Sequence, residues 1–575
     1  MCRYRHVAGK LLAFASAASL AAAGLVAVQA TGASAASPTT IYLSPVGSDA
    51  AAGTSAAPIK TLIEAQTRVR AALSAGNTPV SVELADGTYS MTSTLNLTEQ
   101  DSGTSTAPVT WRAASGARPV IAGGRAVGPS WSTYSGQIRV APVGANLDFD
   151  QLFVGGQRQI LARYPNYDPT KRLGGYAADA IAPARVAGWA HPETALVRGL
   201  HDLEWGGNSF RATGRNADGT LALTWVGDNQ RGSGLHTTYR MVENVFEELD
   251  SPGEWFYDKG AGNLYYWPPA GVDLSTAAVR LGELNELIRV QGTSPTSPAH
   301  DITFTGLNFT ATHRTMFNST YTPISLSDWT IVRKAAVAMK NTERITVGGS
   351  TFDQLGGNAV FMDGYAKGNV IDNDVFTDVG ASDVAIVGSE AAARQASTWA
   401  NQISTMTDLT PGPQTEDYPR DITVSNNLMA NMGVYEKQSA GVEISRASRV
   451  TVTHNTIHDG PRSGINIGDG TWGGHHIDHN DIWNMVKETG DHGPINAWGR
   501  DRYWPISGAS DAQRKQWATL DVIAPNVIEY NRIWHNFEWA VDLDDGSSNY
   551  ILRDNVFLNS GTKFREGFNR TSTNN

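Results

Sequence analysis

The sequence predicts an all-β protein, a right-handed parallel β-helix with an N-terminal capping helix and an inserted β-domain. Three observations support this fold class. The 575-residue chain is rich in Gly, Trp and Tyr and only 18% charged, which is typical of β-rich extracellular proteins. A six-residue pattern recurs in its second half about every 24–28 residues. The segments between repeats consist of short strands and polar turns, as in solenoid proteins.

The first 35 residues have the pattern of a secretory signal peptide. Arg3, Arg5 and Lys10 precede an apolar run, and residues 33–35 (Ala-Ser-Ala) form a small-x-small cleavage motif. We expect cleavage after residue 35 and a secreted, extracellular protein, with a retained membrane anchor as the alternative. The only cysteine, Cys2, lies in this segment. The mature chain therefore contains no disulfide bond and no thiolate metal site.

The charge of the mature chain restricts its partners. Loss of the three basic residues of the leader changes the net charge from −11 to −14. Such a surface repels nucleic acid and anionic membranes, so we expect neither as a partner. Neutral sugars are not repelled, and the expected partner of this monomeric protein is a polysaccharide or an oligosaccharide.

The capping helix and the first turns of the coil are expected within residues 36–122. Ile59–Leu73 has helical spacing and would cover the open N-terminal end of the solenoid, as terminal caps do. Val80–Ile121 has the pattern of the first rungs. The repeat is absent from residues 123–292, where short strands, aromatic residues and Gly/Pro turns predict an inserted β-domain. A β-sandwich is one architecture that fits this pattern. The main coil is expected over residues 293–575, with rungs resuming at Ile302.

The repeat has an apolar residue, then a small polar one, usually Asn, three positions later, and a second apolar residue two positions after that. In a β-helix this Asn lies at a bend, where its amide stacks on the Asn of the next turn and satisfies groups that would otherwise be buried unpaired. A β-sandwich with coincidental spacing is the alternative. The seven matches are Val347/Ser350/Phe352, Ile371/Asp374/Phe376, Val424/Asn427/Met429, Val452/Asn455/Ile457, Ile477/Asn480/Ile482, Ile528/Asn531/Ile533 and Leu552/Asn555/Phe557.

Aligned rungs bring polar residues to one position of one face. Counting eleven residues from the ladder Asn gives Asn466 and Asp542, and the recognisable strands of two other rungs give Glu443 and Asn496. Their neighbours in sequence are apolar, so alternation predicts that these four side chains face solvent. Rungs are about 4.8 Å apart, which suits the carboxyl separations of about 5–9.5 Å in glycosidases. We expect a groove lined by carboxylates, amides and an aromatic ring.

A long insertion beside this groove is dense in ionisable and aromatic residues, as loops that bind or react are. Its sequence ETGDHGPINAWGRDRYW, together with WAVDLDDGSSNY and KFREGFNR, resembles secreted bacterial β-helix proteins of the pectate-lyase-like superfamily. It is most similar to the β-helix glycoside hydrolases that include α-L-fucosidases and xylanases (family 141). The resemblance implies two acidic catalytic residues among the aspartates of DHG, GRD and VDLDD.

The sequence therefore predicts a secreted glycoside hydrolase acting on plant or microbial polysaccharide by carboxylate acid/base chemistry. For Asp542 and Asp544, the structural alternative to catalysis is a turn cap or a carboxylate paired with Arg565. The candidate catalytic residues are Asp491, Asp542, Asp544, Glu443 and Asp501. The candidate substrate-binding residues are His492, Trp498, Arg500, Arg462, Asn466, Asn496, Trp472 and Tyr503.

Two other functions remain open. A polysaccharide lyase acting on uronate polymers would use Lys487 or Arg500 as base, often with Ca²⁺. A non-catalytic carbohydrate-binding solenoid would need no carboxylate pair. We expect no required cofactor, with calcium at Asp542–Gly546 as an alternative.

The C-terminal part of the sequence has two further features. In His475-His-Ile-Asp-His479, strand alternation would put His475 and His479 on one face, but the spacing matches no zinc motif, so no metal site is expected. The chain stops twenty residues after Asn555 without a capping segment. We therefore expect a coil truncated at its C-terminus.

Overall fold

The computed structural model describes residues 38–228, 234–317, 319–324, 326–327 and 329–575. The predicted signal peptide, residues 1–35, lies outside this part of the chain. Among the described residues, no helix combines the length and the apolar character needed to cross a membrane.

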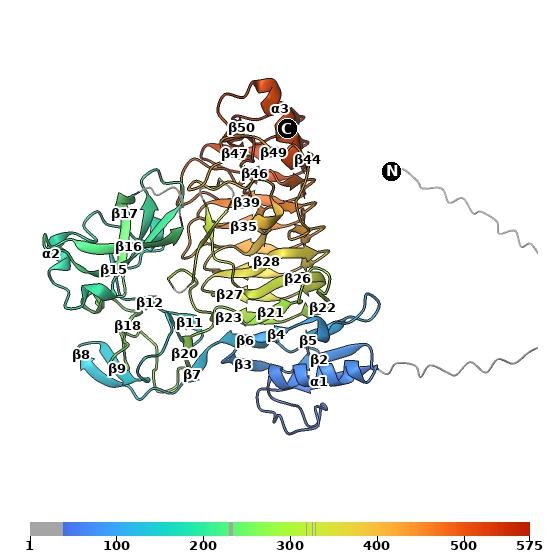
Figure 1. Ribbon diagram of the computed structural model, residues 1–575. Helices are drawn as coiled ribbons and strands as arrows, with labels where there is room; N and C mark the ends of the chain where they lie inside the picture. The colour runs from blue at the N-terminus through green and yellow to red at the C-terminus, as the bar shows by residue number, and fades with distance from the viewer. Residues whose placement is uncertain (1–37, 229–233, 318, 325, 328) are drawn as a thin grey trace, which may run out of the picture. The chain divides into compact units, whose positions relative to one another are not determined.

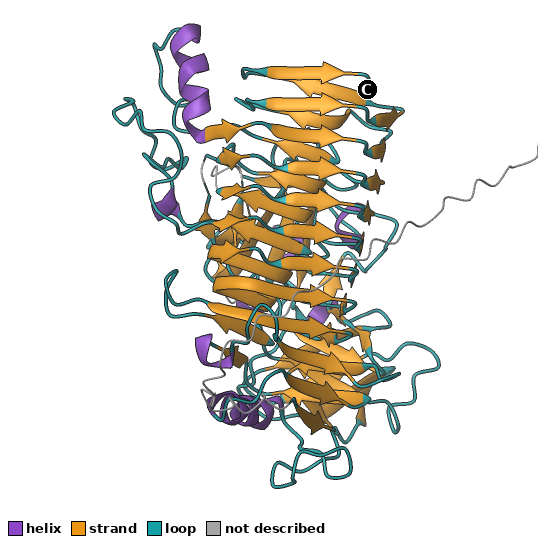
Figure 2. Ribbon diagram, turned by 90° about the vertical axis from the view of Figure 1, so that its right-hand side faces the viewer, coloured by secondary structure: helices purple, strands orange, loops and turns teal. Residues whose placement is uncertain are grey.

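Short parallel strands wind into a coil whose turns stack on one another (Figure 2). Each full turn contributes strands to three parallel sheets, so the predicted parallel β-helix is confirmed. Sheets I and II share the long strand β26 (Ala335–Gly348), which pairs with both.

The three sheets have the following strands. Sheet I consists of β4 (Leu95–Leu97), β21 (Ile288–Gln291), β26, β28 (Asn358–Lys367), β31 (Val384–Val387), β35 (Ala440–Ser445), β39 (Ser463–Ile467), β43 (Ile495–Ala497), β47 (Trp539–Leu543) and β50 (Gly561–Phe564). Sheet II consists of β1 (Thr39–Leu43), β2 (Val80–Leu84), β5 (Val109–Ala113), β22 (Ala299–Thr305), β26, β29 (Val370–Asp372), β33 (Thr423–Ser425), β37 (Thr451–Thr453), β41 (His476–Asp478), β45 (Asn526–Glu529), β48 (Tyr550–Arg553) and β51 (Arg570–Thr573). Sheet III consists of β3 (Gly87–Met91), β6 (Pro119–Gly123), β23 (Asn308–Thr310), β27 (Thr351–Asp353), β30 (Val375–Thr377), β34 (Leu428–Ala430), β38 (Thr456–His458), β42 (Asp481–Trp483), β46 (Arg532–Trp534) and β49 (Val556–Leu558). Short strands between sheets I and II are β32 (Pro419–Arg420), β36 (Ala447–Ser448), β40 (Trp472–Gly473) and β44 (Val522–Ala524).

Period-two alternation produces the core of the coil. In sheet I, Val442, Ile465, Ile495 and Val541 lie in register on neighbouring strands and are completely buried in one continuous apolar cluster. Burial of one such side chain is worth roughly 1.5–3 kcal/mol. Because each turn repeats the same alternation, the residue between two core residues points out of the coil.

The predicted Asn ladder runs through the coil. The backbone N–H of each ladder residue donates to the side-chain oxygen of its counterpart on the next turn, from Ser350 onward. The continuing bonds join Asp374 to Asn427 (2.9 Å), Asn427 to Asn455, Asn455 to Asn480, Asn480 to Asn531, Asn531 to Asn555 (each 3.0 Å) and Asn555 to Asn575 (3.1 Å). The ladder thus pairs backbone groups that the bend leaves outside the sheets.

A helix packs against the first strands of the coil. Helix α1 (Leu62–Ser74) begins three residues later than predicted, because the Thr61 side chain accepts the N–H of Glu64 and caps it. Its buried residues, including Leu62, Ala65 and Val69, belong to the same apolar cluster as the coil. The helix contacts β1, β2 and β4.

Between β6 and β21 the chain leaves the coil and forms three smaller sheets (Figure 1). The first contains β7 (Arg125–Val127), β10 (Gln151–Val154), β11 (Gln157–Arg158) and β20 (Val279–Gly282). The second contains β8 (Ser132–Ser135), β9 (Ile138–Pro142), β12 (Ile160–Leu161), β18 (Glu254–Asp258) and β19 (Asn263–Tyr266). The third contains β13 (Arg163–Tyr164), β14 (Leu196–His201), β15 (Gly207–Arg215), β16 (Leu221–Asp228) and β17 (Leu235–Glu243). Helix α2 (Pro183–Val186) lies in this inserted segment.

Two connections of the coil are long. The connection from β23 to β26 contains β24 (Thr322–Pro323) and β25 (Thr330–Ile331) and packs on the outer face of sheet I. The connection from β43 to β44 contains α3 (Asp511–Asp521), which a capping box between Ser510 and Gln513 begins.

Candidate active site

A row of polar side chains follows the outer face of sheet I. Glu443, Asn466, Asn496 and Asp542 lie opposite one another on β35, β39, β43 and β47, in the order that the rung alignment predicts. Lys563 on β50 occupies the next position. The preceding strands have Phe361 and Ala385 there, so the row is polar only in the later turns.

Hydrogen bonds join the row from strand to strand. Asn466 Nδ2 donates to Glu443 Oε2 at 2.8 Å. The Asn496 amide lies between Asn466 Oδ1, 3.1 Å away, and Asp542 Oδ2, 3.2 Å away. The two amides thus bridge the carboxyl groups at the two ends of the row.

The prediction that these four side chains face solvent is wrong. They point out of the coil, but all four are 0% exposed, because other segments cover the face. The cover includes Trp329, from the β23–β26 connection, and Trp498, whose rings meet edge to face with centroids 6.2 Å apart. Alternation along a strand reports direction and not exposure, and Trp329 comes from more than a hundred positions away in sequence.

Three predicted substrate-binding residues belong to this cover. The Arg462 guanidinium lies 4.7 Å from the Trp329 ring centroid and 5.0 Å from that of Trp498. It also contacts His492 Nε2. His492 and Arg462 are buried, and burial together with the Arg462 charge lowers the pKa of His492 well below its ordinary value. His492 is therefore neutral at physiological pH.

Lys563 gathers three of the candidate catalytic carboxylates. Its Nζ lies 3.2 Å from Asp542 Oδ2, 3.3 Å from Asp491 Oδ1 and 3.3 Å from Asp544 Oδ1. The same Nζ lies 4.2 Å from the centroid of the Trp539 ring. We call Lys563 and these three aspartates the lysine–aspartate cluster.

The surroundings shift the pKa values of Asp542 and Lys563 in this cluster, and that of Glu443 at the other end of the row. Burial and the neighbouring Asp544 charge raise the pKa of Asp542 to about 8, despite the opposing charge of Lys563. Burial opposes the charge of Lys563, yet the three aspartates outweigh it and raise the pKa of this lysine. Burial also raises the pKa of Glu443 well above its ordinary value. At neutral pH Asp542 is therefore mostly protonated, while Lys563 is charged.

Solvent reaches the cluster from the side of Asp491. The side chain of Asp491 is 40% exposed, whereas those of Asp542 and Asp544 are 0% and 9% exposed. Arg565, which is 53% exposed, lies 3.5 Å from Asp544 Oδ1. The alternative in which Asp544 pairs with Arg565 is thus present in the structure, and Asp544 contacts Lys563 as well.

Arg500, a predicted substrate-binding residue, makes its contacts within the protein. It is buried, and its guanidinium lies 2.8 Å from Asp545 Oδ2 and 3.8 Å from Asp544 Oδ2. The rings of Trp399, Trp498 and Trp504 surround it at 5.4–5.6 Å. Arg500 therefore fixes the turn that carries the two aspartates.

Three further predicted site residues, Asp501, Tyr503 and Trp472, lie outside both the polar row and the lysine–aspartate cluster. Asp501 is buried and accepts the N–H of Gly470 at 3.0 Å, and burial together with the Asp521 charge raises its pKa well above the ordinary value. Tyr503 is 2% exposed and donates to the Gly546 carbonyl, and Trp472 is 1% exposed against Tyr418. Trp472, Tyr503 and Trp498, three of the predicted substrate-binding residues, have buried rings that this structure does not present to a sugar.

The histidine-rich stretch also differs from the prediction. His475 is buried, where its Nδ1 accepts the N–H of Val450, whereas His479 follows strand β41 with φ +53° and is exposed. The two therefore do not share a face. Ligand atoms of His454, Asp478 and His479 lie within 4.8 Å of one another at this surface.

Sequence reasoning missed Lys563, although it lies in the stretch KFREGFNR. Counting eleven residues from Asn555 gives Glu566, whereas Lys563 follows this ladder Asn by only eight residues. The alternation of β50 and its position one rung after Asp542 could have identified it. No local signal marks Trp329, since its role depends on packing against a distant rung.

Comparisons with known proteins support the fold. Residues 332–504 match the family model described as "Right handed beta helix region". The fold is a right-handed parallel β-helix. Search of curated proteins gave no match to this β-helix.

Several solved structures align with this chain, three of them as follows. A structure titled "Glycoside hydrolase" aligns with a TM-score of 0.71 and 18% identity, covering 93% of this β-helix chain and 96% of that chain. A complex of XylC with xylose aligns with a TM-score of 0.47 and 11% identity over 89% of this chain and 68% of that one. An alginate lyase from Paenibacillus sp. str. FPU-7 aligns with a TM-score of 0.41 and 10% identity over 93% and 99%. At 18% identity the similarity to the structure titled "Glycoside hydrolase" concerns the fold alone.

Proposed function

We propose that this protein is a secreted glycoside hydrolase that cleaves a plant or microbial polysaccharide, with Asp542 as general acid. The lysine–aspartate cluster carries the proposal. A general acid must hold its proton at the working pH, and a pKa of about 8 meets this condition for Asp542. Secretion rests on the N-terminal sequence, and the hydrolase reading is supported by the fold shared with the structure titled "Glycoside hydrolase".

Asp491 is the best partner for Asp542 as nucleophile or general base. Its side chain is 40% exposed, so substrate and water can reach it. Both carboxylates have an oxygen within 3.3 Å of one nitrogen, and these oxygens are no farther apart than twice that distance. This limit is compatible with the separation of about 5–5.5 Å in retaining enzymes. Asp544 would then hold Lys563 and Arg565 beside the pair.

The contacts give less support to the other predicted functions. Lys487 pairs with Asp459 at 3.1 Å, and Arg500 is buried and held by Asp545 at 2.8 Å, so neither predicted lyase base is placed to abstract a proton. Lys563 belongs to the cluster, but its raised pKa keeps the amine protonated, and a protonated amine cannot abstract a proton. Calcium at Asp542–Gly546 is disfavoured because Lys563, Arg500 and Arg565 contact its carboxylates.

Incubation of the protein with a panel of polysaccharides in H₂¹⁸O tests the proposal. Hydrolysis adds one labelled oxygen to the new reducing end, and the initial anomer of the product reports retention or inversion. We expect labelled product with retained configuration. Unsaturated, unlabelled products would establish a lyase, and binding without cleavage of any polymer would support the non-catalytic solenoid.

A further inference from the structure

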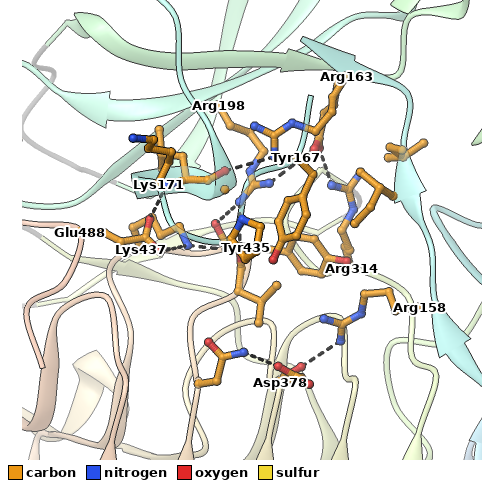
Figure 3. A pocket seen from close by; sticks show the side chains of 18 of the residues that line it. Arg158, Arg163, Tyr167, Lys171, Arg198, Arg314, Asp378, Tyr435, Lys437 and Glu488 are labelled. Atoms are coloured by element: carbon orange, nitrogen blue, oxygen red, sulfur yellow. Dashed lines mark hydrogen bonds and ion pairs between the residues drawn. The ribbon is translucent and has the colours of Figure 1, made fainter. Parts of the chain in front are cut away.

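A cavity of about 410 Å³ lies where the inserted sheets meet the coil (Figure 3). Residues of β11–β14 and of the connection after β13 form one wall, including Arg158, Arg163 and Lys171. Bends of the coil form the other, including Asp378 and Tyr435. Its size is within the range of small-ligand sites, about 300–1,000 Å³, and it does not include Asp542.

Positive charge predominates among the residues that line this cavity, with eight lysines and arginines against four carboxylates. Two of the carboxylates are already shared by buried cations. Glu243 contacts both Arg314 and Arg198, and Asp150 Oδ2 accepts from Arg314 at 2.8 Å. Glu488 pairs with Lys437 at 2.9 Å.

Three of the lining cations have no carboxylate within ion-pair distance in the described part of the chain. Arg158 donates to the backbone carbonyls of Leu355 and Asp378. Arg163 is buried and donates only to backbone carbonyls, of Pro165, Leu173 and Gly175. The side chain of Lys171 is at the exposed rim (Figure 3).

Tyrosine rings accompany these cations. Tyr167 at the rim is 52% exposed, and the Arg163 guanidinium lies 5.9 Å from its ring centroid. Deeper, the Tyr435 ring has the guanidinium groups of Arg158, Arg198 and Arg314 at 5.0–5.3 Å. An exposed ring beside unpaired cations can contact the apolar face of a sugar while the cations contact an acidic substituent.

The cavity adjoins the loop that carries Asp491. Lys487 and Glu488 line the cavity, and Glu488 accepts the N–H of Leu173 at 2.9 Å. Two residues later, Gly490 donates its N–H to the Glu204 carbonyl at 2.9 Å. The inserted segment thus contacts the Asp491 loop directly, and Glu488, which lines the cavity, is three residues from Asp491 in the sequence.

The geometry points to this cavity as a binding site for an acidic sugar residue, one that carries a carboxylate or a sulfate ester. This inference rests on the proposed function in one respect, the class of polymer that is cleaved. It specifies that polymer as a polysaccharide with acidic residues or branches. The anionic substituent binds the cations of Arg158, Arg163 and Lys171, and the ring of the sugar packs on Tyr167. The strongly negative net charge of the chain does not prevent this, because the local charge is positive.

Binding can be measured without turnover, in the Asp542→Asn protein, by titration calorimetry at low ionic strength. The probes are glucuronate, glucose 6-sulfate, glucose and inorganic sulfate. We expect at least one of the two acidic sugars to bind at least tenfold more tightly than either glucose or inorganic sulfate, and to weaken as salt is added. Binding of glucose or inorganic sulfate as tight as that of both acidic sugars, or no binding of either acidic sugar, would overturn the inference.

Two variants locate the site. Lys171→Gln should weaken binding of the acidic sugar three- to tenfold, whereas Lys60→Gln, an equal charge change at an exposed lysine outside the cavity, should not. Tyr167→Ala should also weaken it, in contrast to Tyr530→Ala, which removes an exposed ring from the coil. Equal effects of variant and control would place the binding elsewhere. Asp542→Asn distinguishes the two proposals, because it should abolish hydrolysis and leave binding of the acidic sugar in the cavity intact.

Discussion

Lys563 Nζ lies 3.2 Å from Asp542 Oδ2, from the adjacent strand of sheet I. This contact explains how a carboxyl that is 0% exposed remains part of an ionisable site. The pKa of Asp542 is nevertheless raised to about 8, because burial and Asp544 outweigh the lysine. The pair thus combines a proton donor with a fixed positive charge.

The pH dependence of hydrolysis should report Asp542. Since the acid form is the active one, kcat/KM should fall as pH rises through about 8, the pKa of this group in the free enzyme. The measurement is a pH profile of kcat/KM on the best polymer found, with stability checked at each pH. A rate that stays level to pH 10 would show that another group, or none, donates the proton.

Replacing Lys563 should move this profile. Lys563→Met removes the cation that lowers the pKa of Asp542, so the alkaline limb should shift to higher pH. The rate should fall about 10- to 100-fold, because Asp491 and Asp544 lose the group that positions them. Lys515→Met, at an exposed position of α3, is the control. An unchanged alkaline limb in Lys563→Met would contradict the coupling.

The Asn ladder should be worth more than its single hydrogen bonds. Asn480 donates to Asn531 Oδ1 and the Val452 carbonyl, at 3.0 and 2.9 Å, and accepts the N–H of Asn455. Asn480→Ala leaves buried partners unsatisfied and should cost about 1–3 kcal/mol of unfolding free energy. Denaturant melts should show no comparable loss for Asn401→Ala, which changes an exposed loop residue. Equal stability of both variants would mean that the ladder contributes little.

Asp383 should make stability depend on pH. It is completely buried, neither carboxyl oxygen has a hydrogen-bond partner, and burial raises its pKa well above the ordinary value. Its folded pKa exceeds the unfolded value of about 3.9, so its contribution is most favourable below that pH and is lost as pH rises. Asp383→Asn cannot ionise, and its melting temperature should exceed that of the wild type by more at pH 8 than at pH 4. A pH-independent difference would refute this.

The periodic features of the fold were predictable from sequence. Ladder residues such as Asn455 and core residues such as Ile465 repeat at each turn, and local pattern determines which side of a strand they occupy. The rung alignment therefore predicted the row from Glu443 to Asp542. The truncation expected after Asn555 stays a prediction, although Asn575 extends the ladder by one further turn.

The environment of the site was not predictable in the same way. The Arg462 guanidinium is covered by Trp329, which comes from a connection without any repeat. The rung count missed Lys563 because this residue follows its ladder Asn, Asn555, by eight residues, three fewer than separate Asp542 from Asn531. Aromatic residues such as Trp472 suggested sugar binding by type alone, and type does not reveal whether a ring is exposed.

The most direct test of the account is the rate of hydrolysis by Asp542→Asn measured beside Asp383→Asn. Both changes replace a buried aspartate of raised pKa by its neutral isostere, but Asp383 does not contact the lysine–aspartate cluster. We predict that Asp542→Asn lowers kcat/KM by about 10²–10⁴-fold, the contribution of a general acid, while Asp383→Asn stays within about threefold of wild type. An Asp542→Asn protein that is folded and hydrolyses the polymer at the wild-type rate would contradict the central claim.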